Sequence, residues 1–228
     1  MEIDEEKSVR LFNIKKNQLK LVRRRGYNID REEPLLSYKL QNFLDAYVPF
    51  AKKNRKTLRN VLSQVYQKEV ETESGINKIE RLYVFYADPD TKHKQLGVET
   101  LGEMITEMDR NKAKNGILIT PMNLSSQSKK KIEELLTYNI HVFLESEMAY
   151  DPTEHWLVPA HRPLGVEEQR GFLERNKISI DQIPIILASD MISRYYGFKP
   201  GQVVEIKRVN LYETLVQESL SYRVVKDI

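Results

Sequence analysis

The feature that most limits the folds open to this chain is an alternation of apolar runs and helical patterns between residues 82 and 144. Leu82–Ala87 is rich in aromatic and β-branched residues. Ile117–Ile119 and Ile140–Leu144 are two further short runs of mainly apolar residues. Their length and composition predict three buried strands.

The two stretches between these runs have the spacing of helices. One helical face repeats Val98, Leu101, Ile105 and Met108, and Asn115-Gly116 is expected to end that helix. A second helix is expected at Ser125–Tyr138, burying Ile132, Leu135 and Leu136. Strand, helix, strand, helix and strand with short connections predict an α/β fold with a parallel sheet and crossover helices.

The region before this sheet is predicted to be largely helical. Residues 7–25 have an apolar stripe and end in arginines followed by Gly26, which is typical of a helix and its C-terminal cap. Ser37 is expected to cap a second helix. Thr57–Val70 fits either a helix or an edge strand, and Glu71–Lys78 resembles a loop.

The pattern changes at Tyr150-Asp151-Pro152, which predicts one domain at residues 1–150 and a smaller α/β domain at residues 151–228. The elements expected in the second domain are, in chain order, a helix at Val166–Asn176, an extended segment at Ile183–Leu187, a helix capped by Ser189 or Asp190 and ended by Gly197, and strands at Val203–Arg208 and Leu220–Lys226 with a loop between them.

Composition excludes several classes of protein. No apolar run approaches the roughly 18 residues of a membrane span, and the acidic N-terminus lacks the apolar core of a secretory signal. We therefore expect no membrane partner. The chain has no cysteine, which excludes disulfides, thiolate catalysis and cysteine-ligated zinc and favours a reducing, intracellular location.

The net charge is only +3, but it is uneven along the chain. Residues 1–149 hold 26 basic and 22 acidic side chains, whereas residues 150–228 hold 10 and 11. The basic residues of the first part cluster at Arg23–Arg25, Lys52–Lys56 and Lys129–Lys131. Such clusters either contact phosphates or are solvated helix ends.

One pattern is typical of an enzyme. Asp190, with Glu205 and Lys207 on one face of a predicted strand, has the residue types with which metal-dependent nucleases hold Mg²⁺ and orient a water molecule. Asp190 has an alternative role as a helix cap. The spacing of His155 and His161 matches no helical zinc pair, and glycine-rich phosphate loops are absent, so we expect no metal or cofactor.

A serine cluster, Ser125-Ser126-Gln127-Ser128, precedes Lys129 at a predicted helix start. Its hydroxyls either cap the helix or contact phosphate together with the amide groups there.

Motifs along nearly the whole chain are together similar to the fifth subunit of eukaryotic RNA polymerases and to its archaeal counterpart. They are, in chain order, Leu11-Phe12, Arg24-Arg25-Gly26-Tyr27, Leu82-Tyr83-Val84-Phe85, Gly97-Val98-Glu99-Thr100, His155-Trp156-Leu157-Val158-Pro159-Ala160-His161, Gln182-Ile183-Pro184, Arg194-Tyr195-Tyr196-Gly197 and Gly201-Gln202-Val203-Val204.

The resemblance implies a non-catalytic subunit of a multisubunit DNA-dependent RNA polymerase. Its N-terminal jaw domain, with a nuclease-like βαβαβ sheet that lacks an active site, would lie beside downstream duplex DNA. Its small C-terminal assembly domain would dock on the largest subunit. The implied DNA-proximal residues are Ser125, Ser126, Lys129 and Lys130. The implied residues at the largest subunit are Arg194, Tyr195, Tyr196, Gly197, Gly201, Val203, Tyr222 and Arg223.

The chain departs from the family pattern at three places. Asp190-Met191-Ile192-Ser193 stands for Asp-Pro-Val-Ala, Tyr212-Glu213-Thr214-Leu215 is what remains of a Ser-Glu-Thr-Ala-Gly loop, and Ser125–Ser128 stands for Thr-Pro-Ser-Ala. A divergent member is therefore expected, in the nucleus, or in a virion or viral factory if a virus encodes it. The alternative functions are the nuclease and a stand-alone transcription adaptor.

Overall fold

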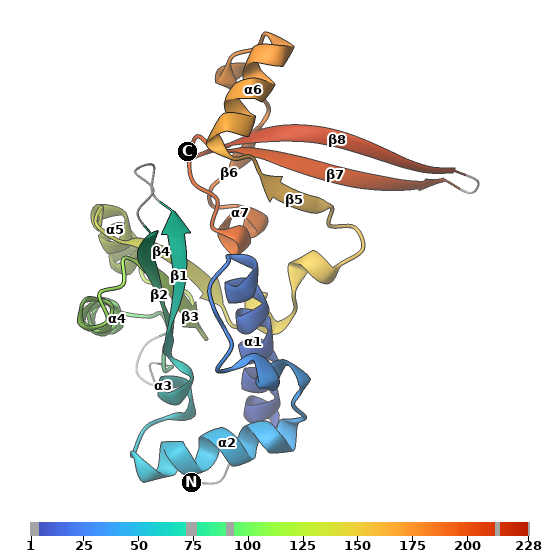
Figure 1. Ribbon diagram of the computed structural model, residues 1–228. Helices are drawn as coiled ribbons and strands as arrows, with labels where there is room; N and C mark the ends of the chain where they lie inside the picture. Colours follow the sequence, from blue (N-terminus) through green and yellow to red (C-terminus); the bar gives the residue numbers. More distant parts are fainter. Residues whose placement is uncertain (1–4, 72–76, 90–93, 213–214, 228) are drawn as a thin grey trace. The chain divides into compact units, whose positions relative to one another are not determined.

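A computed structural model of the chain describes residues 5–71, 77–89, 94–212 and 215–227 (Figure 1). The chain separates into two compact units, Met1–Tyr150 and Asp151–Ile228. Each unit has its own four-stranded sheet. Among the described residues, no helix combines the length and the apolar character needed to cross a membrane.

The sheet of the first unit has the predicted parallel core. It consists of β1 (Gln64–Glu71), β2 (Asn77–Tyr86), β3 (Asn115–Thr120) and β4 (Asn139–Leu144), in that order. Helices α4 (Val98–Arg110) and α5 (Ser126–Glu134) connect the parallel strands β2, β3 and β4. β1 is an antiparallel edge strand. The fold prediction is confirmed.

The segment that fitted either a helix or a strand contains both. α3 (Leu58–Leu62) is a short helix that Thr57 caps, and β1 follows it. Of the loop predicted at Glu71–Lys78, Glu71 belongs to β1 and Asn77 begins β2, while residues 72–76 lie outside the described residues.

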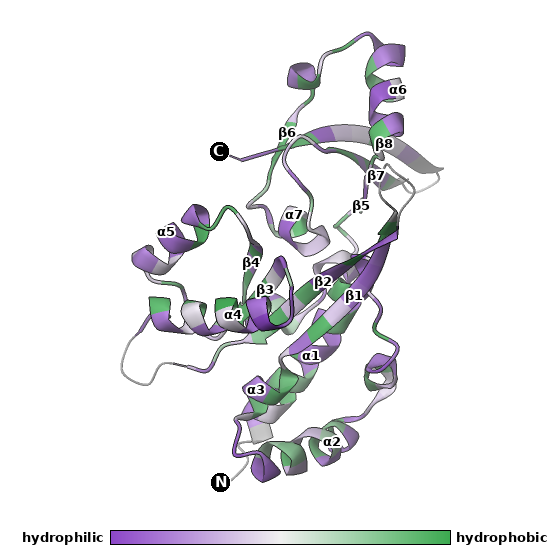
Figure 2. Cartoon of the chain, turned by 60° about the vertical axis from the view of Figure 1, so that its left-hand side comes forward, coloured by the Kyte–Doolittle hydropathy of each residue, from purple (hydrophilic) through white to green (hydrophobic). Residues whose placement is uncertain are grey.

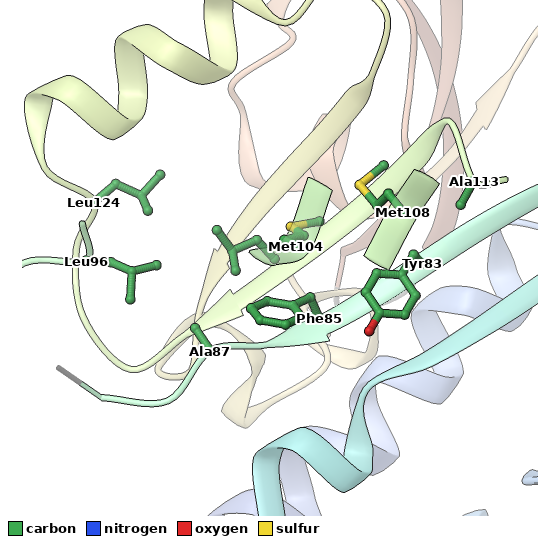
Figure 3. Packing of buried hydrophobic residues seen from close by; sticks show 9 residues of the cluster. Tyr83, Phe85, Ala87, Leu96, Met104, Met108, Ala113 and Leu124 are labelled. Atoms are coloured by element: carbon green, nitrogen blue, oxygen red, sulfur yellow. The ribbon is translucent and has the colours of Figure 1, made fainter. Parts of the chain in front are cut away.

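Helices α4 and α5 cover one face of this sheet. The buried side chains of this layer are Tyr83, Phe85, Ala87, Leu96, Met104, Met108, Ala113, Leu118 and Leu124 (Figure 3). Ile132 of α5 packs against the same cluster. The close approach explains Gly116 of β3, where a Cβ atom would lie 2.6 Å from Cε of Met104.

Two details of these helices differ from the sequence prediction. Asn115-Gly116 does not end α4, because the helix stops at Arg110 and both residues begin β3. Leu136 is not buried but 94% exposed. The predicted helix to residue 138 ends at Glu134, so the helical period that placed Leu136 inward no longer applies there.

The opposite face of the sheet is covered by α1 (Glu5–Arg24), which lies across the sheet from α4 and α5 (Figure 1). The Tyr86 hydroxyl of β2 donates to Oε1 of Gln18 in α1 at 3.3 Å. As predicted, the helix ends at a glycine with left-handed backbone, since Gly26 has φ 81°.

The helices after α1 correct one predicted cap. Glu33–Ser37 is a 3-10 helix, η1, and α2 spans Leu40–Lys53 with Lys39 at its N-cap position. Ser37 therefore does not cap α2. Its hydroxyl donates instead to the Pro34 carbonyl at 2.8 Å, because the serine belongs to the turn of η1.

The second unit is a sheet between two helices. β5 (Ala160–Pro163) pairs antiparallel with β7 (Val203–Tyr212), β7 pairs antiparallel with β8 (Leu215–Lys226), and β8 pairs parallel with β6 (Ile185–Leu187). On one face Val203 and Val224 pack with α6 (Val166–Asn176). On the other, Val204 and Val225 pack with α7 (Met191–Tyr196).

The hairpin of this unit is longer than predicted. The loop expected between Arg208 and Leu220 is largely strand, because β7 and β8 stay paired from Val203↔Val224 to Tyr212↔Leu215. Residues 213–214 lie outside the described part. β5 was not predicted either, because four residues ending in proline carry almost no strand signal. Asp190, rather than Ser189, caps α7, and Gly197 ends it as predicted.

Candidate nucleic-acid and subunit interfaces

The turn before α5 is built by its serines. The Ser125 hydroxyl accepts the Ser128 N–H at 3.2 Å and lies 2.8 Å from the Ser128 hydroxyl. The Ser128 hydroxyl donates to the Leu96 carbonyl at 3.0 Å. Capping is therefore confirmed as the role of Ser125, and Ser128 is fully buried. Both hydroxyls thus make hydrogen bonds within the turn or to the segment beside it.

The remaining residues of this turn face solvent. Ser126, Lys129 and Lys130 are exposed, and no ion pair joins either lysine to a residue within the described ranges. The first turn of α5 has no acidic residue, so the positive end of the helix dipole is unopposed. Figure 2 shows α5 as a predominantly hydrophilic helix. The arrangement can attract an anion at its exposed surface.

The other two basic clusters also lie at helix ends. Lys52 and Lys53 occupy the last turn of α2, where cations complement the helix dipole, and Arg55 and Lys56 follow as exposed residues. Arg23 lies in the last turn of α1, 3.9 Å from Glu33. Both clusters therefore have a local electrostatic role as well as a surface that could face phosphates.

The resemblance implies eight residues at the interface with the largest subunit. Some of them lie in the interior of the second unit and others at its surface. Tyr195 and Val203 are fully buried, so neither offers contact area of its own. Tyr196 packs against the core on the α7 side of the sheet, whereas Tyr222 packs on the α6 side. The structure thus does not gather the eight residues on a single surface.

Several of these residues hold the second unit together. The Arg194 Nε donates to the Ser189 carbonyl at 3.0 Å, and an Arg223 Nη donates to the Ile185 carbonyl at 2.8 Å. Gly197 and Gly201 both have left-handed backbone, with φ 71° and 84°. Gly201 therefore has a backbone conformation that side-chain-bearing residues rarely adopt.

The residues of the nuclease alternative all have structural partners. Asp190 accepts the Ile192 N–H at 2.8 Å as the cap of α7. Glu205 accepts from Arg162 Nε at 3.2 Å and from the Tyr222 hydroxyl at 3.1 Å. Lys207 pairs with Glu218 at 2.8 Å. In the described ranges no cluster of three His, Cys, Asp or Glu could hold a metal ion.

The two histidines of the H-x5-H pair are likewise engaged locally. His155 Nδ1 accepts the Leu157 N–H at 3.2 Å, and His161 Nδ1 donates to the Pro159 carbonyl at 2.8 Å. Burial lowers the pKa of His161, which favours its neutral form. Both rings therefore form hydrogen bonds with the backbone of the segment that contains Pro159.

A buried polar cluster in the first unit was not predicted. Lys15 of α1 is fully buried, and its Nζ lies 3.0 Å from Glu32 and donates to the Tyr66 hydroxyl at 2.9 Å. Tyr66 and Tyr47 both donate to Glu32. Lys15 occupies a polar position in an amphipathic pattern, and nothing local distinguishes it from a solvated lysine.

Burial and pairing oppose each other in this cluster. Burial lowers the pKa of Lys15, and the charge of Glu32 counteracts that effect. Burial alone would raise the pKa of Glu32, but the Lys15 ammonium and the two tyrosine hydroxyls together lower it. The carboxylate is therefore held ionised by its partners.

Comparison with known proteins identifies the class of molecule that these units form. Residues 5–108 match the family model "RNA polymerase Rpb5, N-terminal domain", and residues 150–225 match "RNA polymerase Rpb5, C-terminal domain".

Curated relatives match over most of the chain. DNA-directed RNA polymerase subunit 5-like protein 1 of Arabidopsis thaliana is 31% identical over 87% of this chain and 89% of the relative. DNA-directed RNA polymerases I, II, and III subunit RPABC1 of Caenorhabditis briggsae is 29% identical over 90% of this chain and 92% of the relative. DNA-directed RNA polymerase V subunit 5A of Arabidopsis thaliana is 25% identical over 99% of this chain and 92% of the relative.

These matches define the class as a non-catalytic, structural subunit of DNA-directed RNA polymerase. The prediction that the chain is not an enzyme is confirmed, and the nuclease alternative is wrong. The chain belongs to the RNA polymerase Rpb5 family, as a divergent member.

Proposed function

We propose that the second unit docks on the largest polymerase subunit while the first unit forms the lower jaw beside downstream duplex DNA. The observation that carries the DNA side is the exposed start of α5, where Ser126, Lys129 and Lys130 face solvent at a helix N-terminus without acidic residues. Ser125 contributes by fixing the turn as its cap. Phosphate contacts of this kind position a duplex and do not select its sequence.

The docking side rests on the rigidity of the second unit. Arg194, Tyr196, Tyr222 and Arg223 are partly exposed and hydrogen-bonded or ring-stacked, so their positions are preorganised. Tyr195, Gly197, Gly201 and Val203 would support that surface from within. As a eukaryotic-type polymerase subunit the chain would act in the nucleus, and in a virion or viral factory if a virus encodes it.

Lys129→Glu tests the DNA contact. We expect polymerase carrying this variant to assemble normally but to hold downstream DNA less tightly, with the slope of log K against log salt reduced by about 1 for one lost phosphate contact. The measurement is a salt titration of downstream DNA binding by assembled polymerase.

Lys53→Glu is the matched control, because it reverses the same charge in the cluster at the end of α2. An equal loss in both variants would mean general attraction rather than a contact at α5. Failure of the Lys129→Glu variant to assemble would place the turn at a protein interface.

The docking proposal is tested by purifying the tagged chain from its own cells at moderate salt and weighing the intact complex by mass spectrometry. Recovery in equal proportion with the two largest polymerase subunits is expected. A chain recovered alone would support the stand-alone adaptor instead.

A further inference from the structure

One threonine of the first unit lies directly after a basic cluster. Thr57 follows the segment Lys52-Lys53-Asn54-Arg55-Lys56, so four of the five residues before it are cationic. Among the exposed serines and threonines in the described part of the chain, no other has more than two cationic residues in the five positions before it. Ser179 comes second, with Arg175 and Lys177 before it and Asp181 after it. The basic environment therefore distinguishes Thr57 from the other surface hydroxyls.

The Thr57 side chain is accessible. The residue is exposed, and its backbone is extended, with φ −71° and ψ 159°. Its hydroxyl accepts the Asn60 N–H at 3.1 Å, as the cap of α3, and donates to Oδ2 of Asp88 at 2.9 Å. Both bonds lie at the surface, so water can replace them when the hydroxyl turns outward.

The cations before Thr57 are also available to a partner. All four are exposed, and none of them forms an ion pair with another residue that the structure describes. Arg55 and Lys56, the two cations nearest to Thr57, lie after the end of α2 at Lys53. A protein with carboxylates beside its binding site can therefore reach these charges together with the hydroxyl.

We propose that Thr57 is phosphorylated by a protein kinase that selects basic residues before its acceptor. Charge patterns of this kind determine which substrates a kinase accepts. In the reaction Oγ1 of Thr57 bonds to the γ-phosphorus of ATP, the bond from that phosphorus to the bridging oxygen breaks, and ADP leaves. The hydroxyl proton passes to a carboxylate of the kinase.

Phosphorylation changes the contact between Thr57 and Asp88. The modified oxygen has no proton to donate, and the phosphate carries a charge of about −1.5 to −2 at pH 7. The Asp88 carboxylate repels this charge, whereas Arg55 and Lys56 can pair with it. The modification therefore releases the connection between α2 and α3 from the end of β2. It also lowers the charge of the basic cluster from +4 to about +2.

The first test incubates the purified full chain with ATP and the catalytic domain of a kinase that prefers basic residues before its acceptor. Peptide mass spectrometry locates the phosphate, which we expect at Thr57 and not at a comparable level at Ser179. Thr57→Ala should abolish this incorporation, and Thr57→Ser should retain it because serine keeps the hydroxyl. Incorporation at Ser179 alone, or none at all, would overturn the proposal.

A second pair of variants separates recognition of charge from exposure of the hydroxyl. Replacing all four cations of Lys52–Lys56 by glutamine should lower the initial rate at Thr57 by at least about tenfold, the equivalent of one charge-assisted hydrogen bond. The matched control replaces Lys129–Lys131 by glutamine, which removes a basic cluster that does not adjoin Thr57 in the sequence. It should leave the rate unchanged. Equal losses in both variants would refute recognition of the cluster before Thr57.

The modification should also be present in cells. The chain purified from its own cells with phosphatase inhibitors should yield a peptide phosphorylated at Thr57, and its absence would overturn the proposal. In the isotope-labelled full chain, phosphorylation should shift the amide resonances of Asn60 and Asp88, the partners of the hydroxyl. An unchanged Asp88 resonance would contradict the release from β2. These measurements do not depend on DNA binding, so they are independent of the proposed jaw function.

Discussion

At the scale of single residues, burial decides which polar groups stabilise the fold. Lys15 and Glu32 form a pair that is almost withdrawn from water and is shared by α1, the segment before η1, and Tyr66 of β1. A buried pair adds little compared with apolar packing, but breaking it by removing one partner is costly. The pair therefore links α1 and the segment before η1 to β1.

Lys15→Met tests this pair. We expect the free energy of unfolding to fall by about 3 kcal/mol, because Glu32 is left buried without its cation. Urea denaturation of the full chain is the measurement. Lys15→Met combined with Glu32→Gln should regain part of the loss, since the carboxylate charge is gone.

Lys16→Met is the control for the Lys15 variant. Lys16 is partly exposed and its Nζ lies 5.2 Å from the centre of the Phe12 ring, so its replacement should cost less than about 1 kcal/mol. Equal losses at positions 15 and 16 would contradict a special role for the buried pair.

At the scale of elements, several helix caps were predictable because their signals are local, although Ser37 does not cap α2 and Asn115-Gly116 does not end α4. Gly26 and Gly197 end helices as expected, and Asp190, one of the two expected candidates, caps α7. Elements that depend on pairing between strands were less predictable from the sequence. The strands β7 and β8 extend beyond their predicted ends, since the bonds that define them join residues far apart along the chain.

Gly201→Val tests the turn that begins β7. Gly201 has φ 84°, and its N–H donates to the Val225 carbonyl at 2.8 Å. A Cβ atom added at this residue would meet no other part of the chain within 4 Å. The expected loss of about 2 kcal/mol comes from backbone strain and not from a clash. The readouts are urea denaturation and incorporation into polymerase, which should fall.

Asparagine separates strain from crowding at this position. It tolerates left-handed backbone better than valine, so Gly201→Asn should lose clearly less stability. If both the valine and the asparagine variant unfolded at the same urea concentration as the wild type, the turn would not depend on positive φ.

At the scale of the whole molecule, the chain is two units with separate cores. The second unit packs apolar side chains on both faces of its sheet, with Leu164, Ile183, Val203 and Val224 on one side and Phe198, Val204, Ile206 and Val225 on the other. Such an arrangement supports independent folding even in a small unit.

We therefore expect residues 151–228 to fold when produced alone, with dispersed amide resonances and a cooperative urea transition. A fragment of residues 164–228 is the matched control, because it lacks β5 and leaves the edge of β7 from Val204 to Lys207 unpaired. It should be less stable. Random-coil spectra for the longer fragment would contradict the prediction.

The sequence by itself determined the order of most elements, the change of pattern at residue 150 and the family, because apolar periodicity, capping residues and motif order are properties of the chain itself. Only the tertiary structure decided that Lys15 is buried, that Leu136 is exposed, and that Tyr195 and Val203 lie inside. The exposure of Leu136 follows from the early end of α5, and the other outcomes depend on which distant segment covers a residue. That is set by packing across the sheets and has no signal in the neighbouring sequence.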